Sequence, residues 1–232
     1  MYSALDNDSM PIKLYGITQD PETLNYMVVL SYMKVGSLRS NLMIKKYNPN
    51  DKYENFYYVI KSLLILHQCN LVHGDFHSGN LLLSSQARMY ISDLGLSKPT
   101  DKSSKTNEIF GVLPYIAPEV LLGKPYTKAA DIYSFGIIMW EMTSGIPAFN
   151  NIPHDFDLSL NICQGLRPDI IEGTVPAYVE VMKKCWDSDP NERPTAEKLL
   201  KYFEKWQDEY LYNYGHKRIP VPGKYILIVY FD

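Results

Sequence analysis

Two short polar motifs in the middle of the chain carry side chains that could do chemistry. They are residues 73–80, HGDFHSGN, and residues 93–95, DLG. Asp75 could accept or orient the proton of a hydroxyl group, while Asn80 and Asp93 could offer hard oxygen ligands to Mg²⁺. Phosphoryl transfer from ATP needs both an oriented nucleophile and metal ions held against the phosphates. The spacing of these residues therefore predicts that chemistry.

Short apolar runs on either side of the motifs are expected to hold them in place. Three such runs read as small strands separated by polar turns: Leu71-Val72, Leu81–Leu83 and Met89–Ile91. Asp75 and Asn80 fall on the loop between the first two runs, and Asp93 follows the third. We therefore expect the three polar side chains to converge on one side of a small sheet.

The rest of the chain predicts one hairpin and a mostly helical body. Two strands, Ile12–Thr18 and Tyr26–Ser31, flank a turn at Asp20-Pro21, where proline presets the backbone. Apolar residues recur at helical spacing from Glu54 to Gln68. Other expected segments are a helix from Thr127, a candidate N-cap, to Ser144, helices over residues 155–164, 176–187 and 196–212, the last capped by Thr195, and a mobile surface loop over residues 100–107.

Composition narrows the class of protein. The chain has 232 residues, of which 46% are apolar and 21% charged, enough for one large domain or two small ones. A net charge of -3 gives no general reason to expect nucleic acid or a membrane as a partner. Three widely spaced cysteines without a C-x-x-C pair indicate a reducing compartment. With no signal peptide and no apolar stretch of membrane-spanning length, the sequence predicts a cytoplasmic protein.

Together with later motifs, residues 73–95 resemble a protein kinase catalytic domain. Residues 111–119, GVLPYIAPE, resemble the end of the activation segment, and residues 131–136, DIYSFG, the start of the central helix. Cys185-Trp186 and Arg193-Pro194 resemble the late signature of the family. The resemblance covers about residues 11–210. It implies an α+β fold with a mostly helical large lobe and a remnant hairpin of the small-lobe sheet.

The resemblance also implies roles for individual residues, with ATP and Mg²⁺ as cofactors and a protein as substrate. Asp75 matches the catalytic base, and His77 stands where Ser/Thr kinases have a catalytic lysine. Asn80 and Asp93 match the metal ligands. Five residues match nucleotide-binding positions: Leu30, Ser31, Met33, Ser37 and Leu82. Four match structural positions of the family: His73, Glu119, Asp131 and Arg193. In the family, the arginine at the position of Arg193 pairs with the glutamate at the position of Glu119.

Three positions depart from the pattern of the family. Gly74 replaces the arginine that receives a phosphorylated activation loop, which argues against activation by that route. His77 is a weaker cation than lysine, because an imidazole is mostly neutral near pH 7. Val112 replaces the threonine that helps to define Ser/Thr specificity, and it has no hydroxyl to bond Asp75.

Motifs of the small lobe are not found. We see no Gly-rich loop, no Val-Ala-Ile-Lys strand and no glutamate partner for its lysine, and the first family-like residues match the fourth strand. We therefore expect residues 1–31 to be a remnant of the small lobe, residues 32–212 the large lobe and residues 213–232 a tail outside the family. Impaired transfer is expected, as is self-association through the exposed hairpin edge.

Three functions fit the sequence, and they belong to different classes. The leading hypothesis is transfer of the ATP γ-phosphate to a protein Ser or Thr, and less to Tyr, because the alanine-and-arginine run of tyrosine kinases is absent before Asn80. The alternative is an inactive pseudokinase that serves as a scaffold or binding module. A remote alternative is a small-molecule kinase of the aminoglycoside or choline type, which shares His73-Gly74-Asp75 but lacks Ala117-Pro118-Glu119.

Overall fold

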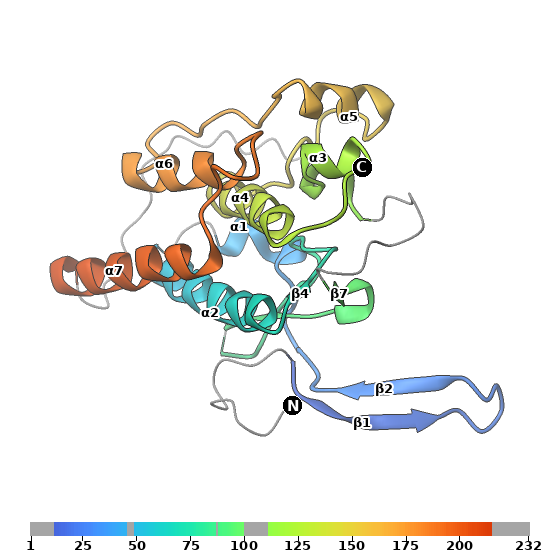
Figure 1. Cartoon of the computed structure of the whole chain (residues 1–232). Helices are drawn as coiled ribbons and strands as arrows, with labels where there is room; N and C mark the ends of the chain where they lie inside the picture. The colour runs from blue at the N-terminus through green and yellow to red at the C-terminus, as the bar shows by residue number, and fades with distance from the viewer. Residues whose placement is uncertain (1–11, 46–48, 87, 100–110, 215–232) are drawn as a thin grey trace, which may run out of the picture.

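The computed structural model describes residues 12–45, 49–86, 88–99 and 111–214 (Figure 1). The strands are β1 (Leu14–Gln19), β2 (Tyr26–Leu30), β3 (Gly36–Ser37), β4 (Leu71–Val72), β5 (Leu81–Leu83), β6 (Met89–Ile91) and β7 (Lys98–Pro99). The α-helices are α1 (Leu42–Lys45), α2 (Pro49–Gln68), α3 (Pro118–Leu121), α4 (Lys128–Ser144), α5 (Phe156–Cys163), α6 (Pro176–Cys185) and α7 (Ala196–Tyr214). The described residues also include the short 3-10 helices η1 (Arg39–Asn41), η2 (Leu94–Leu96) and η3 (Leu113–Tyr115).

Strands β1 and β2 form an antiparallel hairpin that projects from the helical body (Figure 1). Its turn closes at Asp20, whose backbone N–H donates to Asn25 O at 2.9 Å and whose side chain accepts from Glu22 N at 2.9 Å. Every side chain of β2 is exposed, and so are those of β1 apart from Gly16. The hairpin predicted from the sequence is therefore present, with β1 displaced by two residues at its start.

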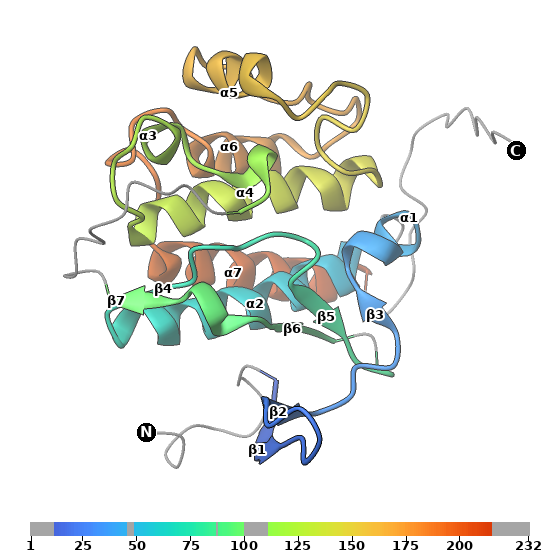
Figure 2. The ribbon, with the colours of Figure 1, turned by 90° about the vertical axis from the view of Figure 1, so that its right-hand side faces the viewer.

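Helix α4 is the centre of the fold. Figure 2 shows it between the pair α2 and α7 on one side and α5 and α6 on the other. Nearly all of its side chains are buried, because apolar residues surround the whole helix. Phe135 of α4 meets Phe56 of α2 at a ring separation of 5.1 Å and Phe203 of α7 at 5.8 Å. Each fully buried ring of this kind contributes about 2–3 kcal/mol to stability.

Two small antiparallel sheets lie beside these helices. One has the strand order β3-β5-β6, and the other pairs β4 with β7. Asn55 of α2 ties the first sheet to the helices, because its side-chain oxygen accepts from Met89 N of β6 at 2.8 Å. The chain is thus α+β and mostly helical with small antiparallel sheets, as the sequence predicted.

Several predicted details differ from the structure. Helix α2 begins at Pro49 rather than Glu54, and the two-residue strands β3 and β7 were not predicted. Thr127 occupies the N-cap position of α4, but its side chain makes no capping hydrogen bond. Thr195 does cap α7, since its hydroxyl accepts from Lys198 N at 3.3 Å. The expected loop at 100–107 and the tail from residue 215 lie outside the described residues.

All three cysteines are free in the structure. No helix in the described ranges is both long and apolar enough to cross a membrane.

Candidate active site

The loop at residues 73–80 runs from β4 to β5, and hydrogen bonds bring its end against the segment that follows β6. Asn80 O accepts from Ser92 N at 2.8 Å and from Ser92 Oγ at 2.9 Å. The side-chain amide of Asn80 donates to Asp75 O at 3.0 Å and to Asp75 Oδ2 at 3.2 Å. Asp93 follows directly after Ser92. The structure therefore gathers Asp75, Asn80 and the Asp93 segment at one edge of the small sheet, as their spacing predicted.

Asp75 has one carboxylate oxygen without a partner. Its Oδ1 atom is buried and makes no hydrogen bond to any described group. A cavity of about 10 Å³ adjoins Asp75, and its lining includes Gly111 and Val112. A cavity of this size admits roughly one water-sized group. An unpaired buried acceptor is unfavourable, so Asp75 Oδ1 is poised to accept a hydrogen bond from a group that enters beside it.

His77 folds back over the same loop. Its Nδ1 atom accepts from Gly79 N at 2.9 Å, which leaves the ring proton on Nε2, and Nε2 lies 3.6 Å from Asp75 Oδ2. Burial lowers the pKa of His77 and outweighs the nearby Asp75 carboxylate, which raises it. His77 is therefore a neutral donor that faces Asp75, and protonation to a lysine-like cation is disfavoured.

Gly79 makes this fold of the loop feasible. A Cβ atom at Gly79 would lie 2.6 Å from Cε1 of the His77 ring. That separation is far inside van der Waals contact, so any larger residue would displace the imidazole.

Asp131, near the start of α4, anchors the beginning of the loop. Its buried carboxylate accepts from His73 N at 2.9 Å, from Gly74 N at 3.1 Å and from His67 Nε2 at 2.9 Å. The His73 ring spans the loop, because its Nε2 donates to Ser92 O at 3.0 Å and its Nδ1 accepts from Asp75 N at 3.3 Å. The backbone at Asp75 is thus fixed from two sides by groups of the helical body and the sheet.

Asp93 has a left-handed backbone conformation, with φ 55° and ψ 71°. Its Oδ1 accepts from Gly95 N at 3.2 Å, and its side chain is exposed. Non-glycine residues seldom adopt this conformation, and such strain gathers at functional sites. The strained turn leaves the Asp93 carboxylate exposed to solvent.

The donor set around Asn80 and Asp93 fits Mg²⁺. This ion binds through one or two protein oxygens and completes its octahedral shell with phosphates and water. An amide oxygen and an exposed carboxylate satisfy that need. Within the described ranges, no cluster of three or more His, Cys, Asp or Glu residues could form a metal cage of protein ligands alone.

The five positions matched to nucleotide binding are only partly brought together. Ser37 of the edge strand β3 pairs directly with Leu82 of the central strand β5, so these two residues lie next to each other in the sheet. Leu30 pairs with Leu14 in the hairpin and is 44% exposed. Ser31 N donates to Lys13 O at 2.9 Å, and Met33 O accepts from Gly36 N at 3.1 Å. These bonds shape the connection from hairpin to sheet.

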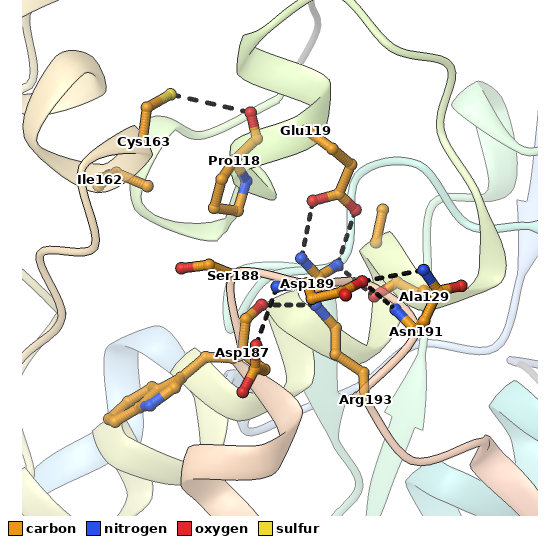
Figure 3. A network of polar contacts seen from close by, with 12 residues as sticks. Pro118, Glu119, Ala129, Ile162, Cys163, Asp187, Ser188, Asp189, Asn191 and Arg193 are labelled. Carbon is orange, nitrogen blue, oxygen red and sulfur yellow. Dashed lines mark hydrogen bonds and ion pairs between the residues drawn. The ribbon is translucent and has the colours of Figure 1, made fainter.

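Glu119 and Arg193 form a buried ion pair (Figure 3). The two terminal guanidinium nitrogens, Nη1 and Nη2, donate to Glu119 Oε1 and Oε2, at 2.7 Å each. Arg193 also donates to Asp187 O at 2.9 Å and to Ala129 O at 2.9 Å. The arginine therefore joins α3, α4 and the segment before α7, and it fixes the end of the segment at 111–119.

Sequence reasoning missed one buried polar group near the site. Glu141 of α4 is fully buried and accepts from Tyr115 Oη at 2.6 Å, and Tyr115 in turn contacts Ser78 of the candidate catalytic loop. The only signal was a glutamate that follows Ile137-Ile138-Met139-Trp140 in an apolar helix. A charged residue in a helix buried on all sides needs a polar partner.

Comparisons with known proteins identify a family and relatives for this chain. Residues 3–203 match the family described as protein tyrosine and serine/threonine kinase. A probable serine/threonine-protein kinase of Dictyostelium discoideum is 32% identical over 217 residues, which cover 87% of this chain and 12% of that protein. The serine/threonine/tyrosine-protein kinase HT1 of Arabidopsis thaliana is 28% identical over 191 residues, 79% of this chain and 48% of its own length. The serine/threonine-protein kinase STY17 of the same plant is 31% identical over 147 residues, 61% and 25% respectively. This chain thus spans at most about half the length of these relatives.

Proposed function

This chain belongs to the protein tyrosine and serine/threonine kinase family, and from that premise we propose that it transfers the γ-phosphate of ATP to a serine or threonine hydroxyl of a protein. The observation that carries the proposal is Asp75 Oδ1, a buried acceptor without a partner beside a small cavity. A substrate hydroxyl that entered there would supply the missing hydrogen bond.

In this proposal each residue of the site has one task. Asp75 accepts the proton of the substrate hydroxyl as its oxygen attacks the γ-phosphorus, and the bond to the β-phosphate oxygen breaks to release ADP. Asn80 and Asp93 would hold Mg²⁺, which would neutralise phosphate charge when bound. His77 keeps its Nε2 proton toward Asp75 and holds the carboxylate in place. Asp131 and His73 fix the backbone that carries Asp75.

Adenine and ribose would lie along the connection from hairpin to sheet. We assign Leu30, Ser31 and Met33 to one side of the nucleotide, and Ser37 and Leu82 to the other. The direct pairing of Ser37 with Leu82 supports the second half of this assignment. In the same scheme the hairpin corresponds to small-lobe strands, residues 32–212 to the large lobe, and residues 213–232 to a tail outside the catalytic domain.

Serine and threonine are favoured over tyrosine as acceptors. The relative from Dictyostelium is named a probable serine/threonine-protein kinase, and the plant relative STY17 a serine/threonine-protein kinase. The name of HT1 also includes tyrosine, which keeps the phenolic hydroxyl as the second acceptor.

The alternative function is that of a scaffold or binding module. These 232 residues contain no Gly-rich loop and no Val-Ala-Ile-Lys strand, the parts that hold the phosphates in this family. A kinase domain that binds partners without transferring phosphate would keep the Glu119–Arg193 and Asp131 anchors and have no need of a nucleotide.

One experiment separates the two functions. The full chain is incubated with radiolabelled MgATP and a generic protein substrate, and its melting temperature is measured with and without MgATP. The proposal expects label on serine or threonine, loss of that label in Asp75→Asn, and loss of the thermal shift in Asp93→Ala. Asp208→Asn, an exposed residue of α7, is the control and should behave like the parent chain. No thermal shift and no label in the parent chain would leave the binding-module function.

A further inference from the structure

A second cavity, which Asp75 does not line, opens between the end of α2, the start of α4 and the start of α7. Gln68, Lys128 and Thr195 belong to these three walls, and we call it the α7 cavity. Its volume is about 500 Å³. Sites for small molecules have volumes of roughly 300–1,000 Å³. None of the residues that line it has a task in the proposed phosphotransfer, so the cavity needs an explanation of its own.

Hydrogen bonds hold the walls of the α7 cavity in place. On the side of α2, His67 Nε2 bonds Asp131 Oδ2 at 2.9 Å. Between the other two walls, Arg193 Nη1 donates to Ala129 O at 2.9 Å (Figure 3). The third wall includes Thr195, whose hydroxyl caps α7. The cavity is therefore formed before any ligand enters, as most small-molecule sites are.

Apolar side chains make up much of the lining. Ile132, Pro194 and Ala196 are buried, and Leu64 and Pro190 are half-buried. A ligand with an apolar body would take its surface out of water against these groups, which is favourable. The rigid rings of the two prolines suit a planar aromatic body.

Lys128 is a charge in this lining without an opposite charge as partner among the described residues. Its Nζ donates to Asn70 Oδ1 at 2.9 Å, and an amide oxygen is neutral. Glu197, by contrast, lies 3.0 Å from Lys201 Nζ. The arginine and the histidine of the lining have the carboxylate partners given above. The unbalanced charge of the α7 cavity is therefore positive, and an anionic group would form a charge-assisted hydrogen bond with Lys128.

We propose that the α7 cavity binds a small aromatic carboxylate, with its carboxylate at Lys128 and its ring against Leu64, Ile132 and the two prolines. The Thr195 hydroxyl accepts from Lys198 N, so its hydrogen is available as a second donor. A small molecule fits better than a protein, because a specific protein interface buries about 800 Å² on each partner. This site lies outside the proposed phosphotransfer, and its occupation does not depend on that activity.

Binding of two probes of the same shape to the full chain tests the charge. Isothermal titration calorimetry should show saturable binding of 2-naphthylacetate, and about threefold to fivefold weaker binding of the neutral 2-naphthylacetamide. In Lys128→Gln the two probes should bind equally. The matched control is Lys183→Gln, because Lys183 is an exposed lysine that lines a different cavity of about 400 Å³. This control should keep the preference for the acid.

Two further measurements test the location. In NMR spectra, 2-naphthylacetate should shift the backbone amides of Asn70 and Ala129 and leave that of Gly165, in the different cavity, unchanged. Ala129→Leu and Gln68→Trp each place a larger side chain in the α7 cavity and should weaken both probes by about tenfold, because the ring loses its space. Gln68 is exposed, so its variant should fold even if Ala129→Leu does not.

The outcomes that would overturn the proposal are equally definite. The parent chain might show no saturable binding of millimolar 2-naphthylacetate, or bind acid and amide equally. The preference for the acid could also survive in Lys128→Gln, or the shifted amides could lie around Gly165 instead of Asn70. Each of these results would remove the α7 cavity as a carboxylate site, whether or not the chain transfers phosphate.

Discussion

At the scale of single residues, the ion pair of Glu119 and Arg193 allows a sharp prediction. The Arg193 guanidinium donates hydrogen bonds to two carboxylate oxygens and two backbone carbonyls. Arg193→Lys replaces it with a single ammonium group, which cannot make the same set of bonds. Because the freed partners stay buried, we expect the free energy of unfolding to fall by about 3 kcal/mol. Denaturant unfolding monitored by tryptophan fluorescence measures it.

An exposed ion pair supplies the comparison. Lys184 and Glu180 lie 2.7 Å apart on the surface of α6. Lys184→Arg should leave the unfolding midpoint unchanged, because solvent-exposed pairs contribute little. If Arg193→Lys also left the free energy of unfolding unchanged, the hydrogen bonds of the buried guanidinium would not contribute to stability.

His77 predicts a pH dependence on the acid side. Burial lowers the pKa of His77 in the folded chain from the ordinary 6.5. Below about pH 6.5 the unfolded chain therefore binds a proton at His77, while the folded chain keeps this side chain neutral until the pH reaches its lowered pKa. Stability is therefore lost as the pH falls from 6.5 to the lowered folded value. In His77→Gln this part of the loss should disappear, which unfolding curves at neutral and mildly acidic pH would show. A parallel pH dependence in both proteins would contradict the assignment.

Residue types in fixed spacing predicted most of the candidate site. Asp75, Asn80, Asp131 and Arg193 each lie in a motif whose chemistry can be read from the sequence. Glu141 could not be found in the same way, because its partner Tyr115 lies 26 residues away in the sequence and only the folded chain brings the two together. A buried polar network depends on packing, which local pattern does not encode.

At the scale of elements, the contact of α4 with α6 depends on one glycine. A Cβ atom at Gly136 would lie 2.9 Å from Cys185 Cβ and 3.1 Å from Trp186 N. Overpacking in Gly136→Ala should therefore cost about 1–3 kcal/mol. Alanine gains about 1 kcal/mol in helix propensity, so we expect a net destabilisation of up to about 2 kcal/mol.

Denaturant unfolding of Gly136→Ala measures that balance. In a Cys185→Gly background the nearest clashing atom is gone, so the penalty of Gly136→Ala should shrink in a double-mutant cycle. A stabilising effect of Gly136→Ala in the parent chain would show that the two helices can move apart freely.

Elements were predictable where side-chain pattern decides them. The apolar spacing located α2 and α4, and the short apolar runs located β5 and β6. The start of α2 was placed five residues late, because residues 50–52 (NDK) are polar and carry no apolar period. Strands β3 and β7 have two residues each and form only because a partner strand lies beside them. Their existence is a tertiary effect.

At the scale of the whole molecule, the helical body and the hairpin differ in how they are stabilised. The body buries a continuous apolar core around α4. The hairpin is a separate two-stranded sheet, and β1 and β2 pair only with each other among the described strands. Two-stranded hairpins are marginal in water without further packing. Stability in this chain therefore resides in the body.

The exposed hairpin leads to a prediction about self-association. Ile17 and Val28 are directly paired across the strands and are 68% and 59% exposed. Apolar side chains on both strands, next to unpaired strand edges, favour pairing with a second copy. We expect sedimentation velocity to show a mass that rises with protein concentration. The double variant Ile17→Lys, Val28→Glu should sediment as a monomer, because its opposite charges keep the cross-strand pair while they remove the apolar surface.

A control of equal exposure makes this prediction specific to the hairpin. Leu122, at the end of α3, is also 68% exposed. Leu122→Lys removes a similar apolar surface from the helical body and should leave the concentration dependence unchanged. If it abolished association as well as the hairpin variant did, general surface hydrophobicity would be the cause. If the parent chain stayed monomeric at every concentration, the hairpin edges would not associate, and the twist and short length of β1 and β2 would be sufficient protection.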